Sequence, residues 1–203
     1  MIILDFGSGN TCKNRKLYID KMIRKLSEID TERKCIIKWQ LFLSAGKNEP
    51  LSRHSFDYAY TKGTELGFKV TASVFDIPSM LFLQEFDIPF IKIANNESLY
   101  RKIIPIVSSR VPLVVSWNKN KPIADNTNIM CCVSKYPAKF EEYKETFNPN
   151  ELRKGISDHT IDWRLYRKYE PEFYEVHYKL EDSQGLDAGS FARTPNQIKE
   201  ILK

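Results

Sequence analysis

Lys69-Val-Thr-Ala-Ser-Val74 and Phe90-Ile-Lys-Ile-Ala94 are two apolar runs with β propensity, and Pro78–Phe86 between them has the apolar spacing of a helix. A strand, a helix and a second strand in this order indicate parallel strands joined by a right-handed crossover. This unit decides the fold because the same alternation recurs on both sides of it.

Six further apolar runs carry the alternation to both ends of the chain: Ile2–Leu4, Cys35–Trp39, Leu113–Ser116, Ile129–Val133, Lys154–Ser157 and Phe173–His177. Helical periodicity is found at Leu17–Ile29, Phe56–Leu66, Leu99–Val107, Phe140–Phe147, Asp162–Tyr169 and Pro195–Leu202. Eight such units favour a closed barrel, and no G-x-G-x-x-G follows the first strand to favour an open dinucleotide-binding sheet. We therefore predict one α/β domain over residues 1–203, a compact (β/α)8 or TIM barrel, with a loop or single turn at Asn118–Asn128.

The composition is that of an ordinary globular protein, with 42% hydrophobic and 28% charged residues. Met1-Ile-Ile-Leu-Asp5 has no basic leader, no apolar run approaches the ~20 residues of a membrane span, and the four cysteines lack C-x-x-C spacing. The net charge of +5 comes from basic residues scattered over several helices. We therefore expect a cytoplasmic protein that binds neither nucleic acid nor membrane.

Every predicted strand is followed by polar or charged residues, at the end of a barrel where active sites lie. In chain order these are Asp5, Lys38 with Gln40, Ser73 with Asp76, Lys92 with Asn95 and Glu97, Ser116, Ser134 with Tyr136, Ser157 to Thr160, and His177 with Lys179. The barrel interpretation therefore predicts one site built from all eight strand ends.

His159 and His177, two of the three histidines, follow the neighbouring seventh and eighth strands. Neutral imidazoles are good ligands for a first-row divalent metal that keeps open positions for water or substrate. A single histidine at a strand end is more often structural, but two at adjacent ends favour a metal site. The third histidine, His54, is expected on a helix surface.

Lys38 and Lys92 end otherwise apolar strands, where a lysine is costly to desolvate unless an anion meets it. With hydroxyl groups of Ser116, Ser134, Ser157 and Tyr136, they could bind a phosphate and a carboxylate. The alternative is that the two lysines pair with Glu97 or Asp5 and only plug the barrel. For Glu97, a role in acid–base catalysis and a role as a capping carboxylate for a helix starting near Ser98 are about equally supported.

Four stretches resemble the sialic acid synthases: Lys92-Ile-Ala-Asn-Asn-Glu97, Ser134-Lys-Tyr-Pro137, Ser157-Asp-His-Thr160 and Glu175-Val-His177, with Gly185-Leu-Asp187 after the last. Members of this family condense phosphoenolpyruvate with N-acetylmannosamine or a related sugar. The resemblance extends from Ile2 to Lys203, but only over the family's barrel. It implies that the C-terminal antifreeze-like domain is lacking.

The resemblance also implies roles for individual residues. His159 and His177 would bind a divalent metal, with Mn²⁺ expected and Mg²⁺ or Co²⁺ as alternatives. Phosphoenolpyruvate would contact Lys38, Lys92, Asn95, Ser116, Ser134, Tyr136 and Ser157, and the sugar would contact Gln40, Ser73, Phe75 and Asp187. The catalytic residues would be Glu97, Asp5 and Lys92. A homodimer is a further expectation, and so short a chain would suit a virus-encoded enzyme that acts in the host cytoplasm.

Three positions depart from the family's pattern. Asp5 stands where the family has a glutamate, and Asn95 and Ser134 stand where it usually has a serine and an asparagine. Two alternatives to a sialic acid synthase therefore remain at this stage. One is a synthase that makes 3-deoxy-octulosonate or deoxy-heptulosonate phosphate, and the other is a catalytically silent barrel that only binds a ligand.

Overall fold

The computed structural model of the chain describes residues 1–107, 111–117, 127–146 and 155–202. Its strands form a closed barrel in which each strand pairs in parallel with the next and β8 pairs with β1. The strands are β1 (Ile2–Asp5), β2 (Cys35–Leu41), β3 (Lys69–Val74), β4 (Ile91–Ile93), β5 (Leu113–Trp117), β6 (Thr127–Cys132), β7 (Gly155–Asp158) and β8 (Phe173–His177). The predicted (β/α)8 barrel is confirmed.

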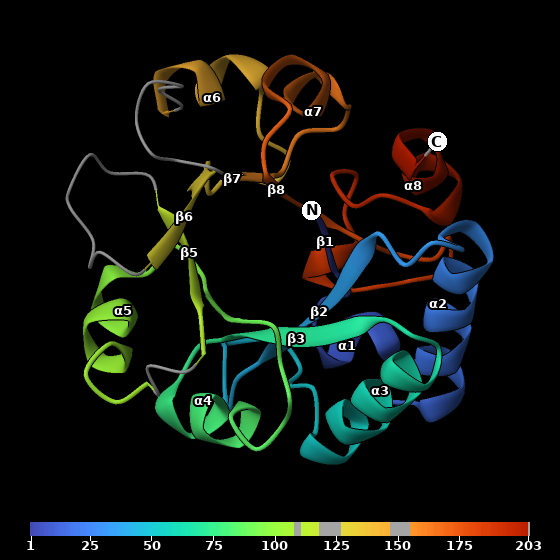
Figure 1. Ribbon diagram of the computed structural model, residues 1–203, viewed down its shortest axis with the longest axis vertical. Coiled ribbons are helices and arrows are strands. Elements are labelled where there is room, and N and C mark those ends of the chain that lie inside the picture. Colours follow the sequence, from blue (N-terminus) through green and yellow to red (C-terminus); the bar gives the residue numbers. More distant parts are fainter. Residues whose placement is uncertain (108–110, 118–126, 147–154, 203) are drawn as a thin grey trace.

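Helices surround the strands as an outer ring (Figure 1). They are α1 (Gly9–Cys12), α2 (Lys16–Ile29), α3 (Arg53–Glu65), α4 (Ile77–Leu83), α5 (Glu97–Ile103), α6 (Phe140–Thr146), α7 (Arg164–Tyr169) and α8 (Pro195–Leu202), with the 3₁₀ helix η1 (Leu186–Ala188) before α8. The short helices α1 and η1 are not evident from the sequence periodicity. The loop predicted at Asn118–Asn128 lies outside the described residues, except for its last two residues, which belong to β6.

Three helices begin earlier than their apolar spacing predicts, because polar side chains cap them. Ser52, Asp76 and Asn96 each accept a hydrogen bond from the backbone N–H three residues later, at the start of α3, α4 and α5 respectively. Apolar periodicity detects only the helical residues that face the core. It therefore misses a first turn that is stabilised by a polar capping residue. The consequence matters most at α5, where Glu97 becomes the first helical residue.

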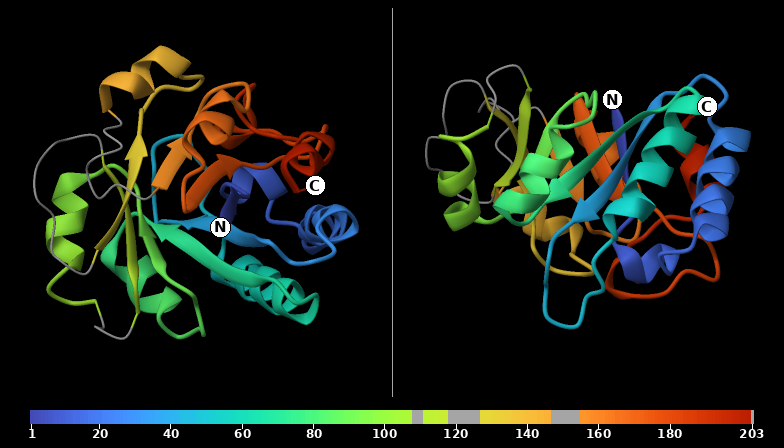
Figure 2. Two further views of the ribbon diagram at one scale, coloured as in Figure 1. Left: turned by 45° about the horizontal axis from the view of Figure 1, so that its top comes forward. Right: turned by 90° about the horizontal axis from the view of Figure 1, so that it is seen from below.

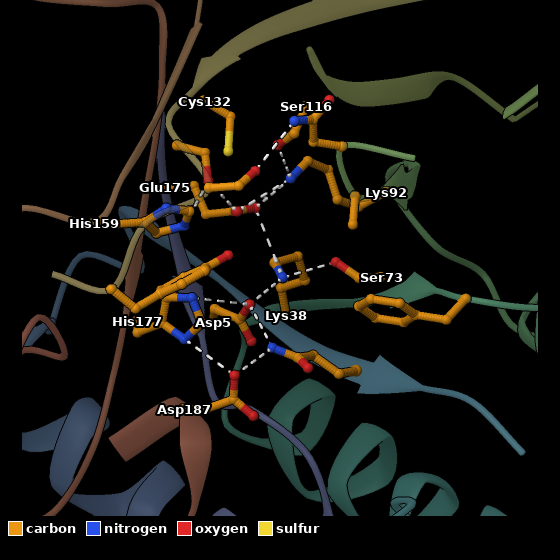
Figure 3. A pocket seen from close by; sticks show the side chains of 17 residues that line it. Asp5, Lys38, Ser73, Lys92, Ser116, Cys132, His159, Glu175, His177 and Asp187 are labelled. Atoms are coloured by element: carbon orange, nitrogen blue, oxygen red, sulfur yellow. Dashed lines mark hydrogen bonds and ion pairs between the residues drawn. The ribbon is translucent and has the colours of Figure 1, made fainter. Parts of the chain in front are cut away.

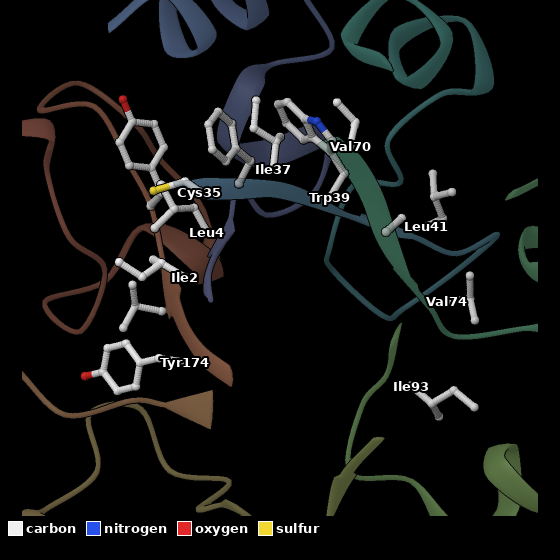
Figure 4. Close-up of a cluster of buried hydrophobic side chains, with 14 of the residues drawn as sticks. Ile2, Leu4, Cys35, Ile37, Trp39, Leu41, Val70, Val74, Ile93 and Tyr174 are labelled. Carbon is white, nitrogen blue, oxygen red and sulfur yellow. The ribbon is translucent and has the colours of Figure 1, made fainter. Parts of the chain in front are cut away.

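Alternating residues of each strand face opposite sides of the barrel wall, and the two sides have different chemistry. The outward residues, such as Ile37, Trp39 and Val74, join a large apolar cluster beneath the helices (Figure 4). The inward residues at the bottom of the barrel form a second, smaller apolar cluster of Ile3, Ile36, Phe90, Val114 and Met130, with Phe173 packed against it. This inner cluster closes the floor beneath the polar strand ends.

Gly155 shows how tightly that floor is packed. A Cβ atom built at this position would lie 2.8 Å from Met130 Cγ and 3.1 Å from Phe173 Cβ. Since real Cβ contacts are longer, a larger residue here would displace the floor or open the barrel. The first inward position of β7 is therefore restricted to glycine by packing.

Both termini lie at the end of the barrel where the strands begin (Figure 2). The amino group of Met1 donates to the Glu172 carbonyl just before β8, and Lys34 Nζ donates to the Leu202 carbonyl just before β2. Within the described residues, none of the helices has the length and apolar character needed to cross a membrane. The opposite end of the barrel is left open for the polar strand ends.

Candidate active site

A cavity of about 240 Å³ occupies the carboxyl ends of the strands (Figure 3). It is lined by Asp5, Lys38, Gln40, Ser73, Phe75, Lys92, Ala94, Asn95, Ser116, Cys132, Ser134, Tyr136, Ser157, His159, Glu175, His177 and Asp187. These include all the site residues predicted from the sequence apart from Glu97. The strand ends of the whole barrel thus converge on one cavity.

The lysine side of the cavity is an ion-pair network of Lys38, Lys92, Asp5 and Glu175 with the hydroxyls of Ser73, Ser116 and Ser157. Lys38 Nζ lies 2.5 Å from Asp5 Oδ2 and 3.7 Å from Glu175 Oε2, and Lys92 Nζ lies 3.1 Å from both oxygens of Glu175. Ser73 Oγ and Ser116 Oγ each accept a hydrogen bond of 2.8 Å, from Lys38 and Lys92 respectively. The pairing of Lys38 with Asp5 was the alternative considered from the sequence, whereas the pairing of Lys92 with Glu175 was not anticipated.

Burial of the lysine side is nearly complete, since Lys38, Lys92 and Glu175 are 1%, 2% and 3% exposed. Burial alone would raise the pKa of Glu175, but the charges of Lys38 and Lys92 outweigh it and lower that pKa to about 2. The pKa of Lys38 is raised, because attraction to Asp5 and Glu175 exceeds the effect of its desolvation. Asp5 and Glu175 are therefore ionised, and Lys38 stays protonated as a hydrogen-bond donor.

The histidine side of the cavity consists of His159, His177, Asp187, Gln40 and Tyr136. The ring centroids of His159 and His177 are 5.5 Å apart, and the Tyr136 ring packs against His159 with a centroid distance of 4.2 Å. Gln40 Nε2 links this side to the lysine side, because it donates to Asp187 Oδ1 at 2.9 Å and to Asp5 Oδ2 at 3.1 Å. The two sides are therefore contiguous around the cavity.

The two imidazoles are held in different ways. His159 Nδ1 lies 2.7 Å from the Val133 carbonyl oxygen, which can only accept, so Nδ1 carries the proton and Nε2 has the lone pair, with Ser157 Oγ 3.5 Å away. Burial, followed by the nearby His177, lowers the pKa of His159 to about 3, so this ring is neutral. His177 lies between two carboxylates, with Nδ1 at 3.5 Å from Asp187 Oδ1 and Nε2 at 3.9 Å from Asp5 Oδ2.

The histidine side contains two unsatisfied polar atoms. Among the described residues, the buried atoms without a hydrogen-bond partner include His177 Nδ1 and Asp187 Oδ2. Imidazole nitrogens backed by a carbonyl, as at His159, or by a carboxylate, as at His177, suit a divalent cation of the first transition row. Residues 1–107, 111–117, 127–146 and 155–202 contain no ready-made set of three or more His, Cys, Asp or Glu ligands. The residues thus fit a cation held by two imidazoles, with its other positions left to water or a ligand.

Two departures from the sialic acid synthase pattern are explained by one contact. Asn95, after β4, and Ser134, after β6, form a hydrogen bond of 3.1 Å from Nδ2 to Oγ. Because the family usually has serine and asparagine at these two positions, the chain exchanges the members of a pair that are in direct contact. The exchange retains an amide and a hydroxyl at the rim of the cavity.

Glu97 does not line the cavity. It is the first residue of α5, and its carboxylate accepts from Arg101 Nη2 at 2.8 Å, one turn further along the helix. An acidic residue in the first turn interacts favourably with the helix dipole, and the i,i+4 pairing adds to this. The structure thus places Glu97 as the helix-start carboxylate considered from the sequence, and its catalytic role remains a prediction. His54 is exposed on α3, as expected.

Glu175 forms ion pairs with both lysines, a role that was not predicted from the sequence. Its position could have been found from strand periodicity, because Glu175 precedes His177 by two residues on β8 and therefore faces the same side of the wall. Cys132 stands at the equivalent inward position of β6 and lines the cavity. Burial raises the pKa of its thiol to about 11, so it is protonated at neutral pH.

Comparison with solved structures finds the same fold in several enzymes. The N-acetylneuraminic acid synthetase from Leptospira borgpetersenii, solved with citrate, has a TM-score of 0.78 and 19% sequence identity, over 99% of this chain and 80% of that protein. A putative spore coat polysaccharide biosynthesis protein E from Chromobacterium violaceum has a TM-score of 0.75 and 17% identity, over 99% and 72%.

A truncated 3-deoxy-D-arabino-heptulosonate 7-phosphate synthase from Thermotoga maritima has a TM-score of 0.70 and 13% identity, over 100% of this chain and 84% of that one. No functionally curated protein shows significant sequence similarity to the chain. The sequence profile of the NeuB family, however, matches residues 13–202. Since this match covers nearly the whole barrel, the chain belongs to the NeuB family.

Proposed function

We propose that the protein condenses phosphoenolpyruvate with an unphosphorylated aldose, N-acetylmannosamine or a related N-acetylated hexosamine, to give a nonulosonic acid and phosphate. The observation that carries the proposal is the meeting of two buried lysines and two buried imidazoles in one cavity. Membership of the NeuB family and the likeness to a protein named as a sialic acid synthetase support the same reaction.

Phosphoenolpyruvate would occupy the lysine side of the cavity. Its phosphate and carboxylate need charge-assisted donors, which Lys38 and Lys92 supply from β2 and β4. Ser116 and Ser157 bring hydroxyls to the same space, and Asn95, Ser134 and Tyr136 line its rim. Asp5 and Glu175 pair with the two lysines and hold their side-chain nitrogens in place before the donor arrives.

We further propose that His159 and His177 hold a divalent cation, with Mn²⁺ expected. Such an ion, when bound, supplies Lewis-acid polarisation of a carbonyl oxygen. The Val133 carbonyl keeps the His159 Nε2 lone pair available, and Asp187 lies behind His177 in the manner of a supporting carboxylate. The aldehyde of the open-chain sugar would therefore be bound at the histidine side.

In the proposed reaction the methylene carbon of phosphoenolpyruvate attacks the aldehyde carbon and forms the new carbon–carbon bond. Water adds at the neighbouring enol carbon, and cleavage of the bond from that carbon to the phosphate oxygen releases inorganic phosphate. Of the three catalytic residues predicted from the sequence, Asp5 and Lys92 lie in the cavity where this chemistry would occur. The sugar would contact Gln40, Phe75 and Asp187, which line the same cavity, and Ser73, which also accepts a hydrogen bond from Lys38 on the lysine side.

The basic residues near the cavity mouth favour an unphosphorylated acceptor. A sugar phosphate needs a cation to bind its phosphate, and the candidates are Lys135, Lys179 and Arg193. Lys135 pairs with Glu142, Lys179 Nζ donates to two backbone carbonyls, and Arg193 is buried beside Trp163 with its guanidinium donating to carbonyls. Among the residues that the structure describes, all three candidates are engaged within the protein, which favours an unphosphorylated acceptor over a sugar phosphate.

The test is release of phosphate from phosphoenolpyruvate in the presence of Mn²⁺, with N-acetylated hexosamines compared against arabinose 5-phosphate and erythrose 4-phosphate. We expect release with an N-acetylated hexosamine, loss of release in Lys92→Met, and normal release in the exposed-lysine control Lys25→Met. Release with a sugar phosphate alone would assign the protein to the other synthases. No release with any sugar would leave a silent barrel as the function.

A further inference from the structure

Tyr143 of α6 is a completely buried residue outside the cavity that holds two cavity residues together. Its side chain is 0% exposed. The hydroxyl donates to the Ser157 carbonyl oxygen at 2.7 Å and accepts from the His159 backbone N–H at 3.1 Å. One hydroxyl group therefore bridges the backbone on both sides of Asp158.

This bridge lies where the sheet stops supporting the chain. Pairing of β6 with β7 ends at Cys132 and Ser157, so His159 extends beyond the last paired residues of these strands. Three further contacts hold His159 in place: Nδ1 donates to the Val133 carbonyl, the His159 carbonyl accepts from Ala138 N–H at 2.8 Å, and Nε2 lies 3.5 Å from Ser157 Oγ. The bond from its N–H to Tyr143 is the one of these contacts that ties the backbone of His159 to the backbone of Ser157.

The two residues joined by this bridge serve different sides of the cavity. Ser157 Oγ donates to Glu175 Oε1 at 2.8 Å, on the lysine side, while His159 carries the imidazole of the histidine side. A tilt of the segment after β7 would move these two groups relative to each other. Efficient catalysis requires the reacting groups to be held in a fixed relative position, because a small displacement lowers the reaction rate strongly.

We infer that Tyr143 is a positioning residue that aligns the anion-binding side of the cavity with its cation-binding side. This inference rests on the proposed function, because it assigns ligands to Ser157 and His159. Tyr143 touches neither ligand and acts through the backbone of β7. Its hydroxyl is analogous to the outer groups that orient metal-binding histidines, whose loss typically lowers metal affinity about 10–100-fold.

The test compares Tyr143→Phe with a matched control, Tyr178→Phe. Tyr178 is also 0% exposed, and its hydroxyl donates to a backbone carbonyl, that of Met22 at 3.2 Å, but on the α2 side of the wall. Each variant loses one buried hydroxyl and keeps its ring, so both should lower the unfolding midpoint. Only Tyr143→Phe should weaken Mn²⁺ binding, by about tenfold or more in calorimetry, and lower kcat with a smaller change in KM for phosphoenolpyruvate.

Two binding measurements keep the inference separate from the proposed reaction. Mn²⁺ affinity reports on His159 and sulfate affinity reports on Ser157, and neither requires turnover. If either affinity falls in Tyr143→Phe and not in Tyr178→Phe, the inference stands even when no sugar is a substrate. Unchanged affinities for both ions, or equal losses in the two variants, would overturn it.

If Tyr143→Phe does not fold, hydrogen exchange of the unaltered protein provides a second measurement. The His159 amide should exchange as slowly as the amides within β7, because the Tyr143 hydroxyl occupies it. Rapid exchange of that amide in the folded protein would contradict the bridge.

Discussion

The lysine side and the histidine side of the cavity lie next to each other on one ring of strand ends, but they differ in how well their polar atoms are satisfied. On the lysine side, Lys38 and Lys92 meet carboxylates and hydroxyls at 2.5–3.1 Å. On the histidine side, His177 Nδ1 and Asp187 Oδ2 are buried without a hydrogen-bond partner. Buried polar groups normally find partners, so a cation bound on the histidine side, as proposed above, would account for the difference.

The same comparison bears on how the cavity binds anions. Two lysines and two ionised carboxylates give the lysine side no net charge, so a dianion entering it gains little long-range attraction. A cation on the histidine side would supply the missing positive charge. The two sides are therefore expected to depend on each other thermodynamically.

The largest effect is expected on the unfolding free energy, when the ion-pair network of the lysine side is broken at Glu175. Glu175→Gln keeps the shape of the side chain but removes the charge that compensates two buried lysines. Loss of one partner in a buried ion pair typically costs about 3–5 kcal/mol, and we expect a decrease of this size in the unfolding free energy measured with urea. A decrease below about 1 kcal/mol would mean that water or other groups already compensate the lysines.

The next effect tests whether the histidine side is built for a cation. Asp187→Asn removes the carboxylate behind His177 and is expected to weaken Mn²⁺ binding about 10–100-fold in calorimetry. Asp182→Asn is the control, since Asp182 is an exposed aspartate that pairs with Lys21 on the surface. Equal Mn²⁺ affinity in the two variants would refute a supporting role for Asp187.

A smaller effect should link the two sides. Sulfate, a dianion that stays soluble with Mn²⁺, should bind at least about fivefold more tightly when Mn²⁺ is present, a coupling of about 1 kcal/mol. In His159→Ala the sulfate affinity should be the same with and without Mn²⁺. If the unaltered protein bound sulfate equally tightly with and without Mn²⁺, the lysine side would attract anions without a bound cation.

The smallest effect on stability is expected at Glu97, whose carboxylate belongs to neither the lysine side nor the histidine side of the cavity. Glu97→Gln removes an i,i+4 ion pair with Arg101 and should change the unfolding free energy by no more than about 0.5 kcal/mol. This variant also tests the catalytic role predicted from the sequence, because its fold should be intact. A tenfold loss of kcat at unchanged sulfate affinity would support that role, whereas a normal kcat would remove it.

Much of the cavity could be predicted because the barrel converts sequence order into spatial order. Once eight alternating units are recognised, the residue after each strand must lie at the same end of the barrel, whatever its distance along the chain. This argument placed Lys38, Lys92, His159 and His177 around one site without any tertiary information. The closed barrel confirms that geometric premise.

Helix starts and partner choice were harder to predict. Glu97 was expected at the mouth because it follows Lys92 by five residues at the end of the fourth strand, but Asn96 caps α5 and Glu97 belongs to the first turn of that helix. Glu175 was overlooked as a partner because a charged residue inside a strand was read only as part of a motif. Its inward direction follows from strand periodicity, but its bonds to two lysines depend on the barrel's width and register.

The sequence by itself determined the alternation of strands and helices, the closed barrel and the set of residues at its open end, because periodicity and order along the chain are enough to specify them. Only the tertiary structure decided which of those residues pair: Lys92 with Glu175, Asn95 with Ser134, and Tyr143 with the backbone on both sides of Asp158. Such contacts join residues far apart in the chain over a few ångströms. They depend on register, side-chain direction and burial, which no local pattern encodes.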